Sequence, residues 1–172
     1  MLRNSLAYYG PWQGASIALL IGIAAILLSA CNTTGVDFEY DKQVARFVLE
    51  SEGTGSLVTL PVSQARIQVN PKAVLTEFDI VSVDVTEHEL GTCLQFTLTP
   101  QATRAFYRTS ATHLGKRLVL LVNGRALGLQ RMERPVGNGV LYVFVEIPNS
   151  DLEEMARNLR GTSIELQRKI SG

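Results

Sequence analysis

Residues 116–124 read Lys-Arg-Leu-Val-Leu-Leu-Val-Asn-Gly, and they set the architecture expected for the chain. The apolar run from Leu118 to Val122 is too short for an ordinary helix and is typical of a strand buried on both faces. Asn123 and Gly124 both tolerate a positive φ, which the tightest hairpin turns require. The sequence therefore predicts a strand, a two-residue turn and a return strand that reaches about Met132.

C-terminal to this hairpin, one more strand and one more helix are expected. The strand covers residues 140–145 and follows a glycine-rich turn. Ser150 with Glu153 three residues later matches a capping box, which predicts the start of a helix. Gly161 is expected to end that helix, because glycine is the usual residue just beyond a helix C-terminus. Residues 163–166 are then expected to form a last strand.

N-terminal to the hairpin, Thr99-Pro100 predicts the start of another helix, with threonine as the cap and proline at the first position. Its inward face is expected to carry Ala102, Phe106, Ser110 and Leu114. Thr76 and Asp79 indicate a single capped helical turn within residues 75–80. Strands are expected at residues 43–49, 56–62, 65–69, 81–86 and 92–98. The first two are expected to pair as a hairpin, and Asn70-Pro71 to end the third.

These elements predict an α+β fold in which two helices pack on one antiparallel or mixed β-sheet, preceded by an N-terminal signal helix. Residues 42–172 are long enough for a single domain with its own core. The formal net charge of the whole chain is zero, which gives no reason to expect a nucleic-acid partner. Acidic residues dominate positions 37–89 and basic residues dominate later ones, so we expect the two halves to pair and neutralise each other. A polarised binding face is the alternative.

The first 30 residues are typical of an export signal: a positively charged start, then an apolar run at 17–28. That run is shorter than the roughly 20 residues that cross a membrane. Leu28-Ser29-Ala30-Cys31 resembles the lipobox of bacterial lipoproteins, which implies cleavage between Ala30 and Cys31. Cys31 would then carry a diacylglycerol and an N-acyl chain, and residues 31–41 would form a polar tether. An uncleaved signal anchor is the alternative.

Two further expectations depend on Cys31. The residue after Cys31 is Asn32, whereas an aspartate at this position retains many lipoproteins in the inner membrane. We therefore expect the periplasmic face of the outer membrane, with the inner membrane as the alternative location. An acylated Cys31 also leaves Cys93 without a partner for a disulfide within the chain. Cys93 lies in an expected strand, and we predict that it is a small buried side chain rather than a reactive thiol.

Groups that could carry chemistry do not converge in the sequence. His88 and His113 have no cysteine or carboxylate at metal-ligand spacing, so no metal site and no cofactor are expected. We therefore expect a protein that is not an enzyme. Arg125, Arg131 and Arg134 surround the return strand of the hairpin and would form a partner-binding patch if they shared one face. Solvated strand ends are the simpler reading of the same residues.

Between residues 75 and 161 the order of motifs resembles one known family, the head of the first periplasmic domain of SecD and SecDF, accessory subunits of the Sec translocase. The matching pieces are Leu75-Thr76-Glu77-Phe78-Asp79-Ile80, Phe96-Thr97-Leu98-Thr99 before a helix, Leu114 to Gly124, the Pro135 to Gly139 turn and the final capped helix. The resemblance implies an α+β module of the kind thought to contact emerging preprotein. We expect none of that family's membrane helices or proton-relay residues here, so the resemblance implies a module and not a translocation motor.

Together these features predict a lipid-anchored envelope protein that binds a periplasmic protein or peptide. An enzyme with a cleft near the 123–124 hairpin and a purely structural envelope lipoprotein are the two alternatives. The sequence does not fix the oligomeric state.

Overall fold

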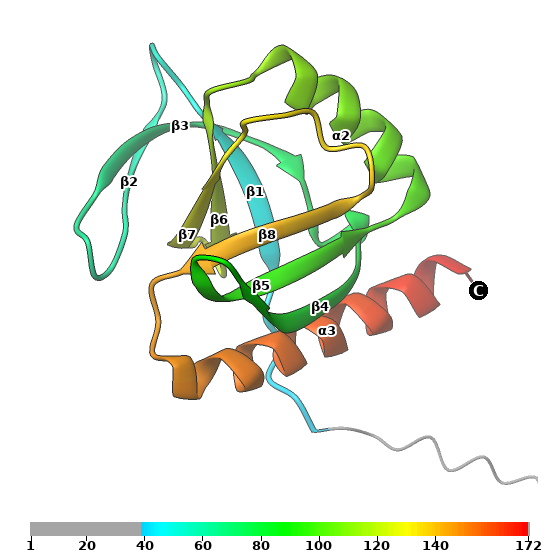
Figure 1. Cartoon of the computed structure of the whole chain (residues 1–172). Helices are drawn as coiled ribbons and strands as arrows, with labels where there is room; N and C mark the ends of the chain where they lie inside the picture. Colours follow the sequence, from blue (N-terminus) through cyan, green and yellow to red (C-terminus); the bar gives the residue numbers. More distant parts are fainter. Residues whose placement is uncertain (1–38, 172) are drawn as a thin grey trace, which may run out of the picture. The chain divides into compact units, whose positions relative to one another are not determined.

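Eight strands form one antiparallel sheet in the computed structural model, which describes residues 39–171 (Figure 1). The strands are β1 (Ala45–Glu50), β2 (Ser56–Thr59), β3 (Arg66–Leu75), β4 (Ile80–His88), β5 (Gly91–Leu98), β6 (Arg117–Val122), β7 (Arg125–Arg131) and β8 (Val140–Val145). Their order across the sheet is β2-β3-β1-β6-β7-β8-β5-β4. With helices α2 (Pro100–Thr112) and α3 (Asn149–Ser171), this confirms the predicted α+β class in its antiparallel form. The predicted signal, Ala30, Cys31 and tether residues 31–38 lie outside the described residues.

The β6–β7 hairpin forms as predicted, and it lies at the centre of the sheet. Leu118 pairs with Gln130, and the turn residues Asn123 and Gly124 have φ angles of 48° and 80°. Both turn residues thus occupy the left-handed region that this turn needs. The local sequence was sufficient to fix this element.

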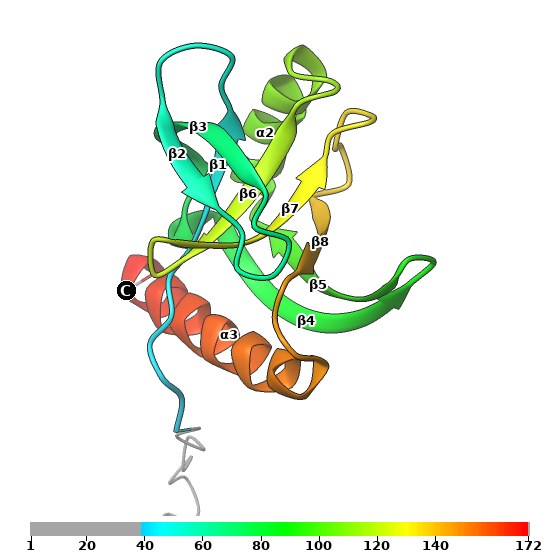
Figure 2. The ribbon, with the colours of Figure 1, turned by 90° about the vertical axis from the view of Figure 1, so that its left-hand side faces the viewer.

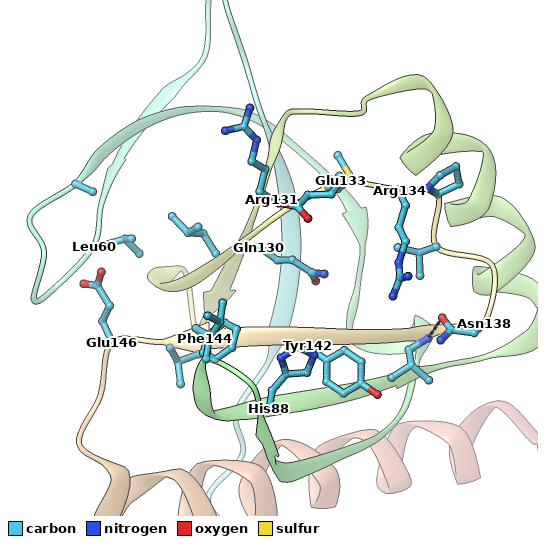
Figure 3. A pocket seen from close by; sticks show the side chains of 18 of the residues that line it. Leu60, His88, Gln130, Arg131, Glu133, Arg134, Asn138, Tyr142, Phe144 and Glu146 are labelled. Atoms are coloured by element: carbon cyan, nitrogen blue, oxygen red, sulfur yellow. Dashed lines mark hydrogen bonds between the residues drawn. The ribbon is translucent and has the colours of Figure 1, made fainter.

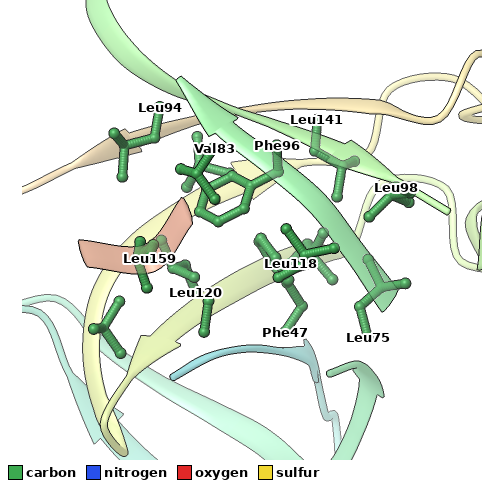
Figure 4. Packing of buried hydrophobic residues seen from close by; sticks show 14 of the residues in the cluster. Phe47, Leu75, Val83, Leu94, Phe96, Leu98, Leu118, Leu120, Leu141 and Leu159 are labelled. Atoms are coloured by element: carbon green, nitrogen blue, oxygen red, sulfur yellow. The ribbon is translucent and has the colours of Figure 1, made fainter. Parts of the chain in front are cut away.

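Side chains of β6 and β1 are buried on both faces of the sheet. Leu118, Leu120 and Phe47 point into the larger core on the face that carries the helices (Figure 4). There the rings of Phe47 and Phe96 meet edge to face, with centroids 5.0 Å apart. On the other face Val119 joins a smaller core that includes Leu60, from the chain segment that follows β2. The predicted double burial of the 118–122 run is confirmed.

Helix α2 begins where the sequence predicts. The Thr99 hydroxyl oxygen accepts a hydrogen bond from the Ala102 N–H at 3.2 Å, and Pro100 is the first helical residue. Ala102, Phe106 and Ser110 are buried on one face as expected. Leu114 does not continue that face: it lies beyond the helix end and is 50% exposed. The capped turn before β4 is also confirmed, since the Asp79 carboxylate accepts from the Thr76 N–H at 2.8 Å.

The predicted hairpin between the first two strands is wrong. β3 lies between β1 and β2 and pairs with both, and β1 uses its other edge to pair with β6 (Figure 2). The predicted stop at Asn70-Pro71 is also wrong, because β3 continues to Leu75. Pro71 is tolerated because the β1–β3 register shifts at this point, and the Asn70 side chain accepts from the Lys72 N–H at 3.0 Å.

Helix α3 does not end at Gly161, and residues 163–166 are helical rather than a strand. The ring of Tyr40 lies so close to Gly161 that a Cβ there would be 2.5 Å from the Tyr40 Cγ atom. Glycine is therefore needed for packing inside the helix, not for a C-cap. The capping box is also absent: the helix begins at Asn149, and the Ser150 hydroxyl donates to Asp151.

The segment before β1 lies along α3. The Tyr40 hydroxyl donates to Glu165 at 2.9 Å, and the Asp41 N–H donates to the Asn158 side chain at 3.1 Å. The Gln43 N–H donates to the Thr162 hydroxyl at 3.1 Å. Residues 40 and 41, predicted as the end of the tether, are thus hydrogen-bonded to the domain.

Acidic and basic side chains from the two halves of the chain pair as expected. The ion pairs are Glu50 with Arg117, Glu52 with Lys116 and Asp84 with Arg160. These pairs are all partly exposed, so each contributes little to stability on its own.

Candidate binding groove between β7 and β8

The sheet opens between β7 and β8. These two strands pair only at Gly128 with Val145 and at Leu129 with Phe144. Beyond that point β7 continues along β6, and β8 continues along β5. Figure 3 shows the two strands separating, with side chains from both sides lining the space between them.

The loop at residues 132–139 accounts for this separation. The Met132 N–H donates to the Lys116 carbonyl oxygen at 3.0 Å, which keeps the end of β7 on β6. The Val136 N–H donates to the buried hydroxyl oxygen of Ser110 at 2.9 Å, which fastens the loop to α2. Ser110 therefore acts as a structural link here. The chain reaches β8 from the direction of α2 and meets β7 only at its far end.

The resulting groove has a volume of about 1090 Å³. Its sides come from the loop after β2, the turn between β4 and β5, and the 132–139 loop. Aromatic side chains from β8 line one side: the ring of His88 lies 5.2 Å from Tyr142 and 6.2 Å from Phe144, centroid to centroid. The groove is thus lined by polar and apolar groups from segments far apart in the sequence.

Glu146 closes one end of the groove. Its carboxylate accepts hydrogen bonds from the main-chain N–H groups of Val62 and Ser63, at 2.8 and 2.9 Å. Burial raises the pKa of this carboxyl, but the hydrogen bonds from Ser63 and Val62 outweigh it and hold the pKa below its usual range. Glu146 therefore stays ionised, with its charge directed at the main chain of the β2–β3 loop.

Gln130 extends from β7 into the gap (Figure 3). Its side-chain oxygen is buried and has no hydrogen-bond partner among the described residues. A buried acceptor without a donor is unfavourable by about 1–3 kcal/mol.

Comparisons with known proteins identify the fold. No family model and no curated protein matches the sequence. A crystal structure of SecDF in its super-membrane-facing form matches with a TM-score of 0.58 at 18% identity, over 70% of this chain and 19% of that chain. A structure of the membrane component SecDF, described as enhancing protein export, matches with a TM-score of 0.56 at 16% identity, over 91% of this chain and 72% of that one.

The chain has a SecDF-like fold. The resemblance drawn from residues 75–161 is confirmed at the level of the fold, and the match covers more of the chain than that segment. The chain nevertheless spans only about a fifth of the length of the first SecDF structure, at 19%.

Two of the three arginines that were predicted to form a partner-binding patch line the groove of the SecDF-like domain. Arg131 and Arg134 are exposed side chains at its rim, and neither forms an ion pair with another described residue. Arg125 begins the same strand that Arg131 ends, so the two lie roughly 20 Å apart along β7. The three arginines therefore do not form one patch.

Sequence reasoning missed the aromatic side of the groove. Tyr142 and Phe144 alternate with buried Leu141 and Val143 in β8, and this pattern indicates that they share the opposite face. Nothing in the sequence around His88 indicated that its ring would lie beside these two aromatic rings. Nothing in the sequence indicated that Glu146 would bind the loop after β2.

The remaining reactive side chains of the SecDF-like domain lie apart from the groove. Cys93 is fully buried, and burial raises the pKa of its thiol, in keeping with the predicted structural role. The Asn123 side-chain oxygen accepts from the Val44 N–H at 2.9 Å, so the 123–124 turn is fastened to the chain before β1. Across residues 39–171, no group of three or more His, Cys, Asp or Glu side chains is placed to hold a metal ion.

Neither helix of the described part of the chain has both the length and the apolar character that crossing a membrane requires.

Proposed function

We propose that this chain is a non-catalytic, lipid-anchored envelope protein whose SecDF-like domain binds a protein or peptide partner in the groove between β7 and β8. The observation that carries this proposal is the groove itself. Its volume of about 1090 Å³ is at the upper end of the roughly 300–1,000 Å³ typical of small-molecule pockets. It is also open along two strands, which suits a polypeptide better than a compact ligand.

The structural neighbours support the same class of partner. One SecDF structure is described as a membrane component that enhances protein export. A domain with the same fold that presents an open groove to its surroundings is suited to contact with polypeptide. The exposed Arg131 and Arg134 at the rim lie where a bound chain would pass.

The anchor is a separate part of the proposal and depends on Cys31. Cleavage after Ala30 and acylation of Cys31 would hold the domain at the membrane, on the periplasmic face of the outer membrane if Asn32 directs sorting. Replacing Cys31 with alanine should leave an unprocessed precursor that incorporates no labelled fatty acid. Normal acyl labelling of Cys31→Ala would contradict the anchor and leave the groove proposal intact.

Photo-crosslinking in cells tests the groove. A photoreactive amino acid at position 134 should capture envelope polypeptides, as should one at position 131. Position 125 is the matched control, because Arg125 is also an exposed arginine of β7 but lies at the far end of the strand. Equal capture at 134 and 125, or capture of lipid alone at 134, would contradict the proposal.

The enzyme alternative placed a cleft near the 123–124 hairpin. Asn123 uses its side chain to bind Val44, and neither Asn123 nor Gly124 lines the groove. The structure therefore gives that alternative no specific support at the predicted place. We retain the binding module as the leading function.

A further inference from the structure

The main-chain groups of β8 alternate between two edges. The Leu98 N–H donates to the Gly139 carbonyl oxygen on the β5 edge, and the Glu146 N–H donates to the Leu127 carbonyl oxygen on the β7 edge. Even-numbered residues of β8 therefore direct their N–H and C=O groups toward β7. By this alternation, the N–H and C=O of Tyr142 point into the gap where the β7–β8 ladder has stopped.

The facing edge of β7 is open at the same place. Met132 directs its N–H to Lys116, the residue just before β6, so by alternation Arg131 directs its main chain toward β8. The next pair after Leu129 and Phe144 would join Arg131 to Tyr142, and that pair is not formed. Open strand edges inside a groove are sites at which another chain can add as a strand.

Side chains around this edge specify what would bind there. Tyr142 and His88 offer aromatic surface beside the edge. The carboxylate of Glu146 is engaged by two main-chain N–H groups. The groove is lined by two acids, Glu133 and Glu146, and by two arginines, Arg131 and Arg134. Neither arginine forms an ion pair with another of residues 39–171, so both guanidinium groups are free to pair with acidic side chains of a partner.

We propose that an extended polypeptide segment carrying acidic side chains adds as a β-strand to the edge of β8 in this groove. The inference rests on the proposed function and deepens it by naming the binding mode and the charge of the partner. Binding would come mainly from main-chain hydrogen bonds at Tyr142, with little dependence on the exact partner sequence. Acidic side chains of the segment would pair with Arg131 and Arg134.

The test uses the full-length chain in detergent micelles and a blocked nine-residue peptide of alternating valine and glutamate. Two N-methyl series of this peptide carry N-methyl groups on alternate residues, and the methylated positions of one are shifted by one residue from those of the other. In an added strand only every second peptide N–H faces β8. One N-methyl series should therefore bind at least tenfold more weakly than the unmodified peptide, and the other should bind within about threefold of it. A peptide with lysine in place of glutamate should bind at least tenfold more weakly.

Equal affinity of the two N-methyl series, whether both bind or both fail, would overturn strand addition. So would equal binding of the lysine and glutamate peptides. Hydrogen exchange of the Tyr142 amide gives a second readout that needs no substitution, and the peptide should slow it at least tenfold. Protection of that amide before any peptide is added would overturn the inference in favour of an occupant from this chain. If position 134 captures polypeptides but the N-methyl series are equal, only the binding mode fails.

Discussion

Replacing Gly161 with alanine tests how the segment before β1 is held on α3. Gly161 lies inside a helix, where alanine is more favourable than glycine by about 1 kcal/mol. The added Cβ, however, would lie 2.5 Å from the Cγ atom of Tyr40, well inside a normal contact. The ring would have to move away from the helix and from its hydrogen bond to Glu165.

These two effects oppose each other, and their balance depends on Tyr40. Overpacking of this kind costs about 1–3 kcal/mol, so Gly161→Ala in the natural chain should range from neutral to about 2 kcal/mol destabilising. In a Tyr40→Ala background the overlap is gone, and the same substitution should stabilise by about 1 kcal/mol. The coupling between the two positions should therefore be about 1–3 kcal/mol.

Urea unfolding of the four variants in a double-mutant cycle measures that coupling. A Gly161→Ala effect that is the same with and without Tyr40 would refute the reasoning. It would mean that the Tyr40 ring is not held against α3 in solution. Stabilisation by Gly161→Ala in both backgrounds would lead to the same conclusion.

Three further outcomes are expected. Gly128→Ala should destabilise by about 1–3 kcal/mol, since its Cβ would overlap the main chain of β8, whereas Gly53→Ala should change urea stability little because Gly53 has no neighbour there. Hydrogen bonds to Glu165, the strongest from Lys169, lower the pKa of its carboxyl from 4.5 to about 2. The ionised carboxylate therefore stabilises the fold fully above pH 4.5, and this contribution is lost as the pH falls toward 2. Glu165→Gln should make the free energy of unfolding depend less on pH over this range. Cys93 should react with a thiol reagent only at the rate of unfolding, and rapid labelling of the native chain would show that it is accessible.

Elements whose cause lies within a few residues could be predicted from the sequence. The Asn123-Gly124 turn needs two residues that accept a positive φ, and these residues supply it. Thr99-Pro100 begins α2 because the Thr99 hydroxyl oxygen accepts from a main-chain N–H of the first turn, and Pro100 has no N–H that would need an acceptor. The burial of Cys93 agrees with its prediction from a small apolar side chain within a strand-like segment.

Features that join distant segments were decided only by the tertiary structure. The residue pattern of a strand does not indicate which other strand it pairs with. The position of β3 between β1 and β2 therefore has no local signal in the sequence. Glycine is the usual residue just beyond a helix end, but Gly161 lies inside α3, where the ring of Tyr40, more than a hundred residues earlier, comes too close for a Cβ. The groove exists because Met132 and Val136 are fastened to different elements, which separates β7 from β8. Local conformational preference is encoded residue by residue, whereas pairing and packing depend on which distant segments meet.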